Sequence, residues 1–305
     1  MAILLNNHGF HNESWEQALS EYLPGMPIHC YPDIPDRAAI KYAVVWEHPH
    51  GDLLNYPNLR AILNLGAGTD HLDAEPELPA APIVRLLDPD VGNDMAQYVN
   101  YWVMHFHRRY EDYREHAARQ HWERIEVPRT QHYRVTTLGL GLIGSFIAER
   151  VAQNGFKSIG WSRKPRDLVD VDCYSGDEGL STVLKNTDVL VNCLPLNPAT
   201  RGFLNKQKLS QLPVGAYFIN VSRGAIIDDE SLLSLLDSGH IAGAALDAFV
   251  TEPLPADSPY WRHKNVFITP HTAGPTYAKS AARVLADNIQ RLENGEVPFP
   301  IHIPG

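Results

Sequence analysis

The 305-residue sequence has few cysteines, no long apolar run and no excess of basic residues. Its three cysteines are widely spaced and lack the paired spacing of a metal site, so we expect a reduced protein of the cytoplasm. No run reaches the roughly 18 apolar residues of a membrane span, and MAILLNNHGF has no basic residues before its apolar part. We therefore expect neither a membrane span nor an export signal. The formal net charge of -10 argues against non-specific binding to nucleic acid or anionic membranes.

Apolar strand-like segments alternate with helical ones along the whole chain. In the first third they are AILLNN, KYAVVW, LRAILNLGAG and APIVRLL, and later they are YRVTTL, SIGWS, DVLVNCL, AYFINVS, AGAALDAF and NVFITP. This rhythm predicts an α/β fold of two Rossmann-like domains with doubly wound parallel sheets. We expect a discontinuous substrate-binding domain at residues 1–97 and 276–305, and a dinucleotide-binding domain at residues 98–275.

Two helical segments flank the second series of strands. The first starts near Asn93 and Asp94, which are good N-cap residues, and runs through AQYVNYWVMHFHRRYEDYREHAARQHW. It is too long for an ordinary connection, so we expect it to bridge two domains or to face a partner subunit. The second runs from Thr276 to about Asn294 and is followed by PFPIHIPG. This tail is too short to be a domain, and we expect it to complete the first one.

The stretch GLGLIG contains Gly139, Gly141 and Gly144. It follows the apolar YRVTTL and opens the helical SFIAERVAQNGF, which is the context of a dinucleotide site. The first glycine makes a tight turn, the second lets a pyrophosphate approach the backbone, and the third lets the helix pack on the strand. The helix N-terminus attracts phosphate groups. The alternative is a structural glycine turn in a domain that binds no nucleotide.

No acidic residue ends the second strand of this domain, where NAD-binding proteins place a carboxylate on the adenosine ribose. The sequence at residues 161–166 is WSRKPR instead. The hydroxyl of Ser162 and the positive charges of Arg163 and Lys164 suit a 2′-phosphate, so the sequence predicts NADPH rather than NADH. Asp167 is a rival acid, placed further on in the expected loop. A solvated basic turn on an NADH-dependent protein is the alternative.

Three polar residues follow later strands: Arg223 in NVSRGAIIDD, Glu252 in VTEPLP and His271 in ITPHTAG. Ligands of open α/β sheets bind beyond the carboxyl ends of the strands. An arginine can orient an anionic 2-oxo acid, a histidine can protonate its carbonyl oxygen, and an acid can keep the imidazole protonated. The three residues together predict reduction of a carbonyl group, with structural charge pairs as the alternative.

The chain resembles the D-isomer-specific 2-hydroxyacid dehydrogenases and, within them, the glyoxylate/hydroxypyruvate reductase branch. The resemblance covers most of the sequence, and its motifs are LGLGLIG, LPLNPATRGFLN, INVSRGAIIDDESLLSLLDSGHIAGAALDAFVTEPLP and SPYWRHKNVFITPHTAG. The stretch NLGAGTDHLD also resembles the substrate loop of the family. The resemblance implies an enzyme that transfers hydride from NADPH to the C2 carbonyl of a small 2-oxo acid, giving a D-2-hydroxy acid.

The resemblance also implies roles for single residues. His271 would be the general acid, Glu252 its partner, Arg223 the cation that orients the substrate, and Asp247 a partner of the nicotinamide carboxamide. The implied cofactor-binding residues are Gly139, Gly141, Leu142, Ile143, Gly144, Trp161, Ser162, Arg163, Lys164, Leu194, Pro195, Val221, Ser222, Asp247, His271, Ala273 and Gly274. The implied substrate-binding residues are Trp46, Leu65, Gly66, Ala67, Gly68 and Arg223. Backbone N–H groups at 65–68 would hold the substrate carboxylate, with an ordinary turn as the alternative.

The resemblance further implies a homodimer with the long helix and residues 119–128 as the contact. We expect no metal site, because the histidines of this region follow no metal-ligand spacing and suit surface or packing roles; they are His105, His107, His116, His121 and His132. A different class of function stays open. The chain would then be a dehydrogenase scaffold that serves as a nucleotide-sensing regulator or as a scaffold for partners.

Overall fold

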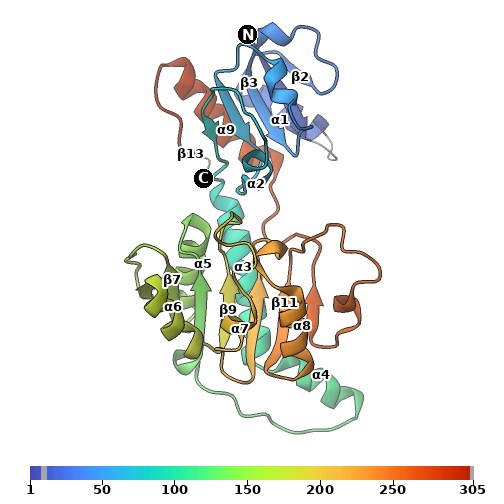
Figure 1. The fold of residues 1–305 in the computed structure, drawn as a ribbon, viewed down its shortest axis with the longest axis vertical. Helices are drawn as coiled ribbons and strands as arrows, with labels where there is room; N and C mark the ends of the chain where they lie inside the picture. Colours follow the sequence, from blue (N-terminus) through green and yellow to red (C-terminus); the bar gives the residue numbers. More distant parts are fainter. Residues whose placement is uncertain (8–11, 303–305) are drawn as a thin grey trace. The chain divides into compact units, whose positions relative to one another are not determined.

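The computed structural model describes residues 1–7 and 12–302, and the chain divides into two compact units. Unit 1 comprises residues 1–91 and 276–305, and unit 2 comprises residues 92–275. Each unit is built around its own sheet (Figure 1). The division falls after Val91 rather than after Gln97, within the first turns of the helix that begins at Pro89.

Unit 1 contains a six-stranded sheet in the order β13-β5-β4-β3-β1-β2. Five strands run parallel, and β13 pairs antiparallel with β5 at one edge. The strands are β1 (Ala2–Asn7), β2 (Ile28–Cys30), β3 (Ile40–Trp46), β4 (Ala61–Asn64), β5 (Ile83–Val84) and β13 (Ile301–His302). The short β2 and β13 were not predicted, because three and two residues carry no readable apolar pattern.

Apolar side chains cover both faces of this sheet. Helices α1 (Asn12–Tyr22) and α9 (Ala278–Glu293) share one core cluster, in which Leu19 and Ile289 are fully buried. On the other face, Leu53 and Tyr56 lie in a second cluster with β3. The helical segment predicted after Thr276 is therefore part of the core of unit 1, and residues 303–305 of that tail lie outside the described residues. The short helices are η1 (Arg37–Ala39), η2 (Asp52–Asn55) and α2 (Asp70–Asp73).

Unit 2 contains a seven-stranded sheet in the order β12-β11-β10-β9-β6-β7-β8, and all its strand pairs are parallel. The strands are β6 (Arg134–Leu138), β7 (Lys157–Ser162), β8 (Asp172–Ser175), β9 (Val189–Asn192), β10 (Ala216–Asn220), β11 (Ile241–Leu246) and β12 (Val266–Ile268). The six predicted strands are present. The seventh, β8, is an edge strand whose side chains are exposed or half-buried, so it shows no apolar run.

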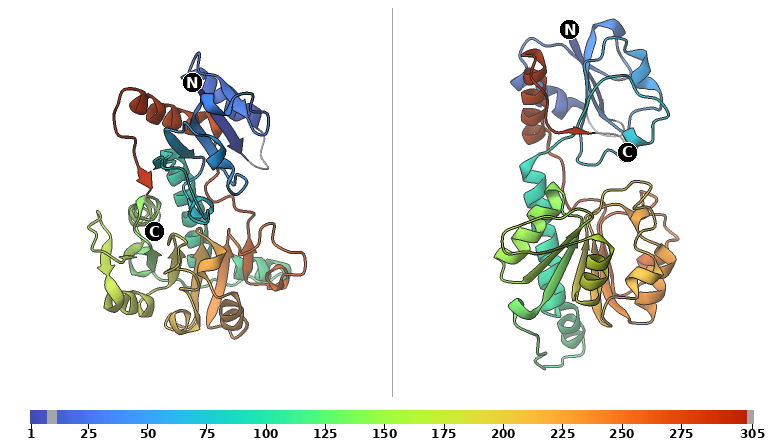
Figure 2. Two further views of the ribbon diagram at one scale, coloured as in Figure 1. Left: turned by 45° about the horizontal axis from the view of Figure 1, so that its top comes forward. Right: turned by 60° about the vertical axis from the view of Figure 1, so that its left-hand side comes forward.

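Helices cover both faces of this second sheet, as expected of a doubly wound fold (Figure 2). Side chains of α6, α7 and α8 share one large cluster, α5 packs a separate small one, and Phe106 of α3 stacks on Tyr217 of β10 with ring centroids 4.3 Å apart. None of the helices in the described residues is long and apolar enough to cross a membrane. The helices of unit 2 are α3 (Pro89–His107), α4 (Tyr110–Ala118), η3 (Thr130–His132), α5 (Leu142–Gln153), α6 (Gly176–Lys185), α7 (Lys206–Leu209), η4 (Gly224–Ile226), α8 (Asp229–Asp237) and η5 (Pro259–Arg262).

The long helix predicted from Asn93 is two helices, and the first of them starts earlier. Helix α3 begins at Pro89, and the Asp88 carboxylate accepts a hydrogen bond of 3.0 Å from the backbone N–H of Asp90. Proline suits the first helical position because its missing N–H needs no partner there. The helix ends before Arg109, whose left-handed backbone (φ +57°) separates it from α4. Single residues at its two ends therefore determine where helix α3 begins and ends.

The glycines of the GLGLIG turn have different surroundings. A Cβ atom at Gly144, in the first turn of α5, would lie 1.9 Å from the carbonyl oxygen of Gly139. Gly139 has a φ of +96°, a conformation that favours glycine. By contrast, a Cβ at Gly141, the N-cap of α5, would meet nothing within 4 Å. The third glycine therefore permits close packing of helix on strand, and the second keeps the backbone open.

We predict that Gly144→Ala destabilises unit 2, whereas Gly141→Ala does not. Because the new methyl group at 144 would overlap a backbone oxygen, the free energy of unfolding should fall by at least about 2 kcal/mol. Gly141→Ala is the matched control, and its loss should stay within about 1 kcal/mol, the size of an N-cap effect. Urea denaturation followed by circular dichroism measures both. Equal stability of the two variants would contradict the packing role of Gly144.

Candidate functional site

Three polar segments follow neighbouring strands of the second sheet. Arg223 lies three residues after the end of β10, Glu252 follows β11, and His271 lies three residues after the end of β12. Strands β10, β11 and β12 are adjacent and parallel. Since parallel strands end at the same edge of a sheet, the three segments emerge side by side, as the sequence predicted.

His271 and Glu252 form a hydrogen-bonded pair. The distance between Nδ1 of His271 and Oε2 of Glu252 is 2.8 Å. The other carboxylate oxygen of Glu252 accepts a 2.8 Å hydrogen bond from the backbone N–H of Phe249. Because an ionised carboxylate only accepts hydrogen bonds, Nδ1 of His271 carries a proton, and the proton of the imidazolium form is held at Nε2. Nε2 is therefore the nitrogen that can give a proton to a ligand.

The pair shifts the pKa of each partner in the direction that favours charge. The hydrogen bond that His271 donates to Glu252, together with the negative charge of Glu252, raises the pKa of His271, although burial and the nearby Arg223 lower it. Burial alone would raise the pKa of Glu252, but its hydrogen bonds with His271 and with the N–H of Phe249 hold that pKa below its usual range. The pair thus favours a protonated imidazole beside an ionised carboxylate.

His271 sits in a left-handed turn that the buried carboxylate of Asp247 stabilises. The φ angle of His271 is +53°, a strained value for a residue other than glycine. One Asp247 oxygen accepts hydrogen bonds from the hydroxyl of Thr269 (2.6 Å) and the N–H of Thr272 (2.8 Å), and the other accepts from the N–H of Ala273 (2.8 Å). The carboxylate of Asp247 therefore binds a side chain before His271 and the backbone after it. Its predicted contact with a nicotinamide stays a prediction.

Close backbone packing places the Arg223 segment against the Glu252 segment. A Cβ at Gly224 would lie only 2.1 Å from the backbone carbon of Phe249, so the two chains touch directly at this point. The Arg223 guanidinium is close enough to lower the pKa of both Glu252 and His271. The structure thus brings together the arginine, the acid and the histidine that the sequence singled out.

The start of helix α5 fits a pyrophosphate group. The open backbone at Gly141 leaves the space that the phosphates need, and the first turn of α5 contains no acidic side chain. The free N–H groups of a helix N-terminus carry a partial positive charge. The residues present therefore fit the phosphates of a dinucleotide.

The side chains predicted to contact the cofactor divide into surface and core residues. Leu142 and Pro195 are exposed. Trp161 is only 3% exposed, and its indole donates a 2.8 Å hydrogen bond to the carbonyl of Gly176, so its contact with the cofactor stays a prediction. A tryptophan at the end of a buried strand gives no sign of which face it occupies. Also buried are Leu194, Val221 and Ala273.

The basic stretch after β7 presents its cations to solvent. Arg163, Lys164 and Arg166 are exposed, and none of them forms an ion pair with a carboxylate in the part of the chain that the structure describes. The hydroxyl of Ser162 donates a 2.7 Å hydrogen bond to the carbonyl of Lys164, which fixes the turn. The strand end thus offers positive charge and no acid, and Asp167 lies in the exposed loop beyond it.

In unit 1, two side chains donate hydrogen bonds to the carbonyl groups of the loop at residues 65–68. The Nδ2 of Asn64 donates to the carbonyls of Gly66 (2.5 Å) and Gly68 (2.7 Å), and Arg85 donates to the carbonyl of Ala67 (2.9 Å). In a trans peptide the N–H points opposite to the carbonyl, so these contacts turn the following N–H groups the other way. Asn64 and Arg85 were not predicted from the sequence. An asparagine at the end of an apolar strand could have indicated a side chain that binds the following loop, whereas no pattern in the sequence indicated this role for Arg85.

The ring of Trp46 packs on the same loop. A Cβ at Gly66 would lie 2.3 Å from this ring, and the ring centroid of His71 is 4.8 Å away. Only glycine at position 66 lets the indole approach the loop this closely. Of the residues predicted to bind substrate, Trp46, Gly66 and their neighbours in the loop are thus adjacent in unit 1.

Comparisons with known proteins agree with this arrangement. Residues 101–273 match the model of the "D-isomer specific 2-hydroxyacid dehydrogenase, NAD binding domain". Glyoxylate/hydroxypyruvate reductase A of Serratia proteamaculans (strain 568) is 36% identical over 304 residues, covering 98% of this chain and 97% of that protein.

Solved structures give the same result. The D-isomer specific 2-hydroxyacid dehydrogenase of Xanthobacter autotrophicus Py2, in complex with NADPH and MES, has a TM-score of 0.96 and 38% identity, covering 99% of this chain and 98% of that one. The NADPH-dependent glyoxylate/hydroxypyruvate reductase of Sinorhizobium meliloti, in complex with NADP and sulfate, has a TM-score of 0.93 and 32% identity, covering 100% and 99%. The predicted fold and family are confirmed: this chain belongs to the D-isomer specific 2-hydroxyacid dehydrogenase family.

Proposed function

We propose that this chain is an NADPH-dependent reductase of small 2-oxo acids such as glyoxylate and hydroxypyruvate. The observation that carries the proposal is the His271–Glu252 pair, 2.8 Å apart, beside Arg223 at the carboxyl edge of the sheet. Relatives named as glyoxylate/hydroxypyruvate reductases, at 36% and 32% identity over almost the whole chain, support this substrate class. The product is a D-2-hydroxy acid when it is chiral.

Each residue of the pair has a separate task in the reduction. When bound, NADPH supplies the hydride. His271 donates its Nε2 proton to the carbonyl oxygen of the substrate as negative charge develops there. Glu252 keeps the imidazole protonated and oriented through its hydrogen bond to Nδ1. Arg223 binds the carboxylate and polarises the carbonyl group of the 2-oxo acid.

The cofactor would be held by unit 2 and the substrate carboxylate by the loop of unit 1. The N-terminus of α5 takes the pyrophosphate, and Ser162, Arg163 and Lys164 take the 2′-phosphate. Structures of relatives in complex with NADPH or NADP support this choice of cofactor. The N–H groups of residues 67–69, which follow the carbonyls held by Asn64 and Arg85, suit an anion.

The roles of the units and the assembly follow from the same proposal. Unit 2 would be the dinucleotide-binding domain, and unit 1 the substrate-binding domain. The exposed aromatic side chains Tyr101 (61% exposed) and Trp122 (101% exposed) support a homodimer contact through α3 and residues 119–128. Three free cysteines support a reducing compartment such as the cytoplasm.

His271→Ala tests the proposed function. The wild-type chain should oxidise NADPH with glyoxylate or hydroxypyruvate, and the variant should lose about 10²- to 10⁴-fold in kcat because it lacks the general acid. Its NADPH affinity, followed by cofactor fluorescence, should be unchanged. His132→Ala, an exposed histidine outside the site, is the control. If the wild type consumes no NADPH with any small 2-oxo acid, the nucleotide-sensing alternative takes the place of the proposal.

Glu252→Gln tests the protonation of His271. Reduction needs the imidazolium form, so kcat/KM should fall as the pH rises through the pKa of His271. Because the hydrogen bond to Glu252 and its negative charge raise that pKa, removing the charge should move this alkaline limb to lower pH. The pH profile of NADPH oxidation measures the shift, and Glu178→Gln, an exposed acid on α6, should leave it unchanged. An unmoved limb in Glu252→Gln would show that Glu252 does not set the pKa of His271.

The double variant Arg163→Ala/Lys164→Ala tests the choice of cofactor. Hydrogen bonds to a charged group contribute about 1.5–3 kcal/mol, so NADPH affinity should fall about tenfold or more. NADH affinity should change little, because NADH has no 2′-phosphate. Isothermal titration calorimetry with each cofactor measures the ratio, and Lys185→Ala removes an exposed cation of α6 as the control. Equal losses for NADPH and NADH would contradict recognition of the 2′-phosphate.

A further inference from the structure

Helix α4 ends in a turn that brings two histidines together. The backbone N–H of His121 donates to the carbonyl of His116 (2.9 Å), and that of Gln120 donates to the carbonyl of Ala117 (3.1 Å). Gln120 is left-handed, with a φ of +55°. These features define a Schellman motif, in which the residue after the left-handed position meets the side chain one turn back. The two residues that meet here are His121 and His116.

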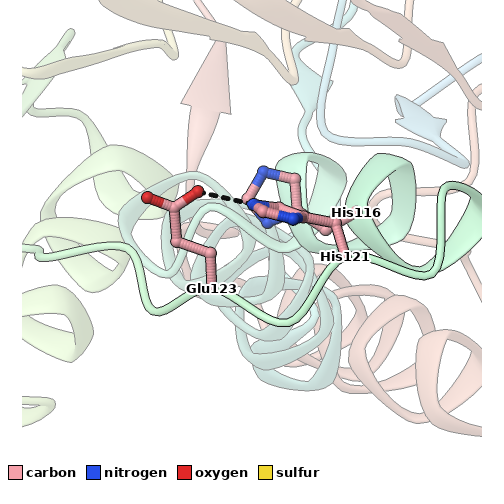
Figure 3. A group of neighbouring side chains, drawn as sticks. All are labelled: His116, His121 and Glu123. Carbon is pink, nitrogen blue, oxygen red and sulfur yellow. Dashed lines mark hydrogen bonds and ion pairs between the residues drawn. The ribbon is translucent and has the colours of Figure 1, made fainter.

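Glu123 completes a cluster with these two histidines (Figure 3). The imidazole rings of His116 and His121 are 5.0 Å apart between centroids, at an interplanar angle of 82°. Oε2 of Glu123 lies 2.7 Å from Nε2 of His121. One ligand atom from each of the three residues lies within 4.8 Å of the other two.

The spacing of these three residues along the chain does not reveal this cluster. Two histidines on one helix face bind a metal when they stand four residues apart, whereas His116 and His121 are five apart. On a continuous helix such a pair would point in different directions. The left-handed Gln120 reverses the chain, so the two imidazole rings face each other despite this spacing.

We propose that His116, His121 and Glu123 form a binding site for one divalent transition-metal ion, for which Zn²⁺ is the best-suited probe. Two imidazoles and one carboxylate are typical ligands of zinc, and a water molecule would complete the tetrahedron. The carbonyl end of helix α4 adds a partial negative charge that favours a cation. The site is separate from the His271–Glu252 pair and does not depend on the proposed reductase activity.

The cluster needs only small movements to bind zinc. Bonds of about 2.0–2.1 Å at tetrahedral angles place ligand atoms about 3.3 Å apart. Glu123 and His121 must therefore separate slightly from 2.7 Å, and the widest separations must close from at most 4.8 Å. The side chains of His121 and Glu123 are 54% and 63% exposed, so they are free to make these adjustments. The metal would replace the proton that His121 now shares with Glu123 and release it to solvent.

Metal binding would tie an irregular segment to its helix. Residues 121–129 contain no helix or strand. The segment is held at Ile125, whose N–H donates to the Tyr113 hydroxyl (2.8 Å), and at Pro128, whose carbonyl is 2.8 Å from Nε2 of His107. A metal on His121 and Glu123 adds a third attachment, to α4.

Isothermal titration calorimetry of the full chain with zinc chloride, after removal of metal with EDTA, tests the site. We expect one Zn²⁺ per chain. His121→Ala and Glu123→Gln should each weaken the affinity for zinc. Loss of a residue that only supports a metal ligand lowers metal affinity about 10- to 100-fold, and loss of a ligand itself should cost at least as much. Both side chains are exposed, so the fold should be retained, and circular dichroism verifies this. His116→Ala should have the same effect.

Two control variants make the result specific. His132→Ala removes an exposed histidine outside the cluster, and His271→Ala removes the histidine of the catalytic pair. Both should bind zinc as the wild type does. The proposal is overturned if the wild type binds no zinc, if His121→Ala binds it equally well, or if His271→Ala abolishes binding.

Discussion

The common direction of the seven strands in unit 2 determines where its candidate functional residues lie. Every strand of this sheet ends at the same edge, so each connection that leaves a carboxyl end adds one group to that edge. The glycine turn follows β6, the basic stretch follows β7, and the Arg223, Glu252 and His271 segments follow β10, β11 and β12. Residues that are spread over more than 130 positions of the sequence therefore lie along one edge of the sheet, because the strands are parallel.

The fold and the main chemical groups were readable in the sequence because they depend on strong local patterns. Buried strands read as continuous apolar runs, and the GLGLIG turn stands where a strand meets a helix. The features that were not readable depend on single contacts. The start of α3 at Pro89 depends on the Asp88 cap, and its end depends on a left-handed Arg109. Short edge strands such as β8 and β13 are defined by their pairing with β7 and β5, which the sequence does not show.

In the candidate site, the types of the residues could be predicted from the sequence, but their contacts could not. The sequence identified His271 and Glu252 by type, but it did not show that Asp247 holds the turn around the histidine with three hydrogen bonds. It also did not show that the indole of Trp161 donates a hydrogen bond to the carbonyl of Gly176. It also missed Asn64 and Arg85, whose effect lies in which way they turn the carbonyls of a loop. Side-chain direction is a tertiary property, so composition and spacing do not reveal it.

The order of the units along the chain has a consequence for synthesis on the ribosome. Unit 2 is continuous, and all its strands have been made once residue 275 is in place. Unit 1 still lacks α9, which shares the α1 core cluster, and β13, which pairs with β5. Because domains fold as units during synthesis, the later half of the sequence completes its core before the earlier half does. Until the last helix emerges, the apolar face of α1 and its sheet is left without its cover and is open to chaperones.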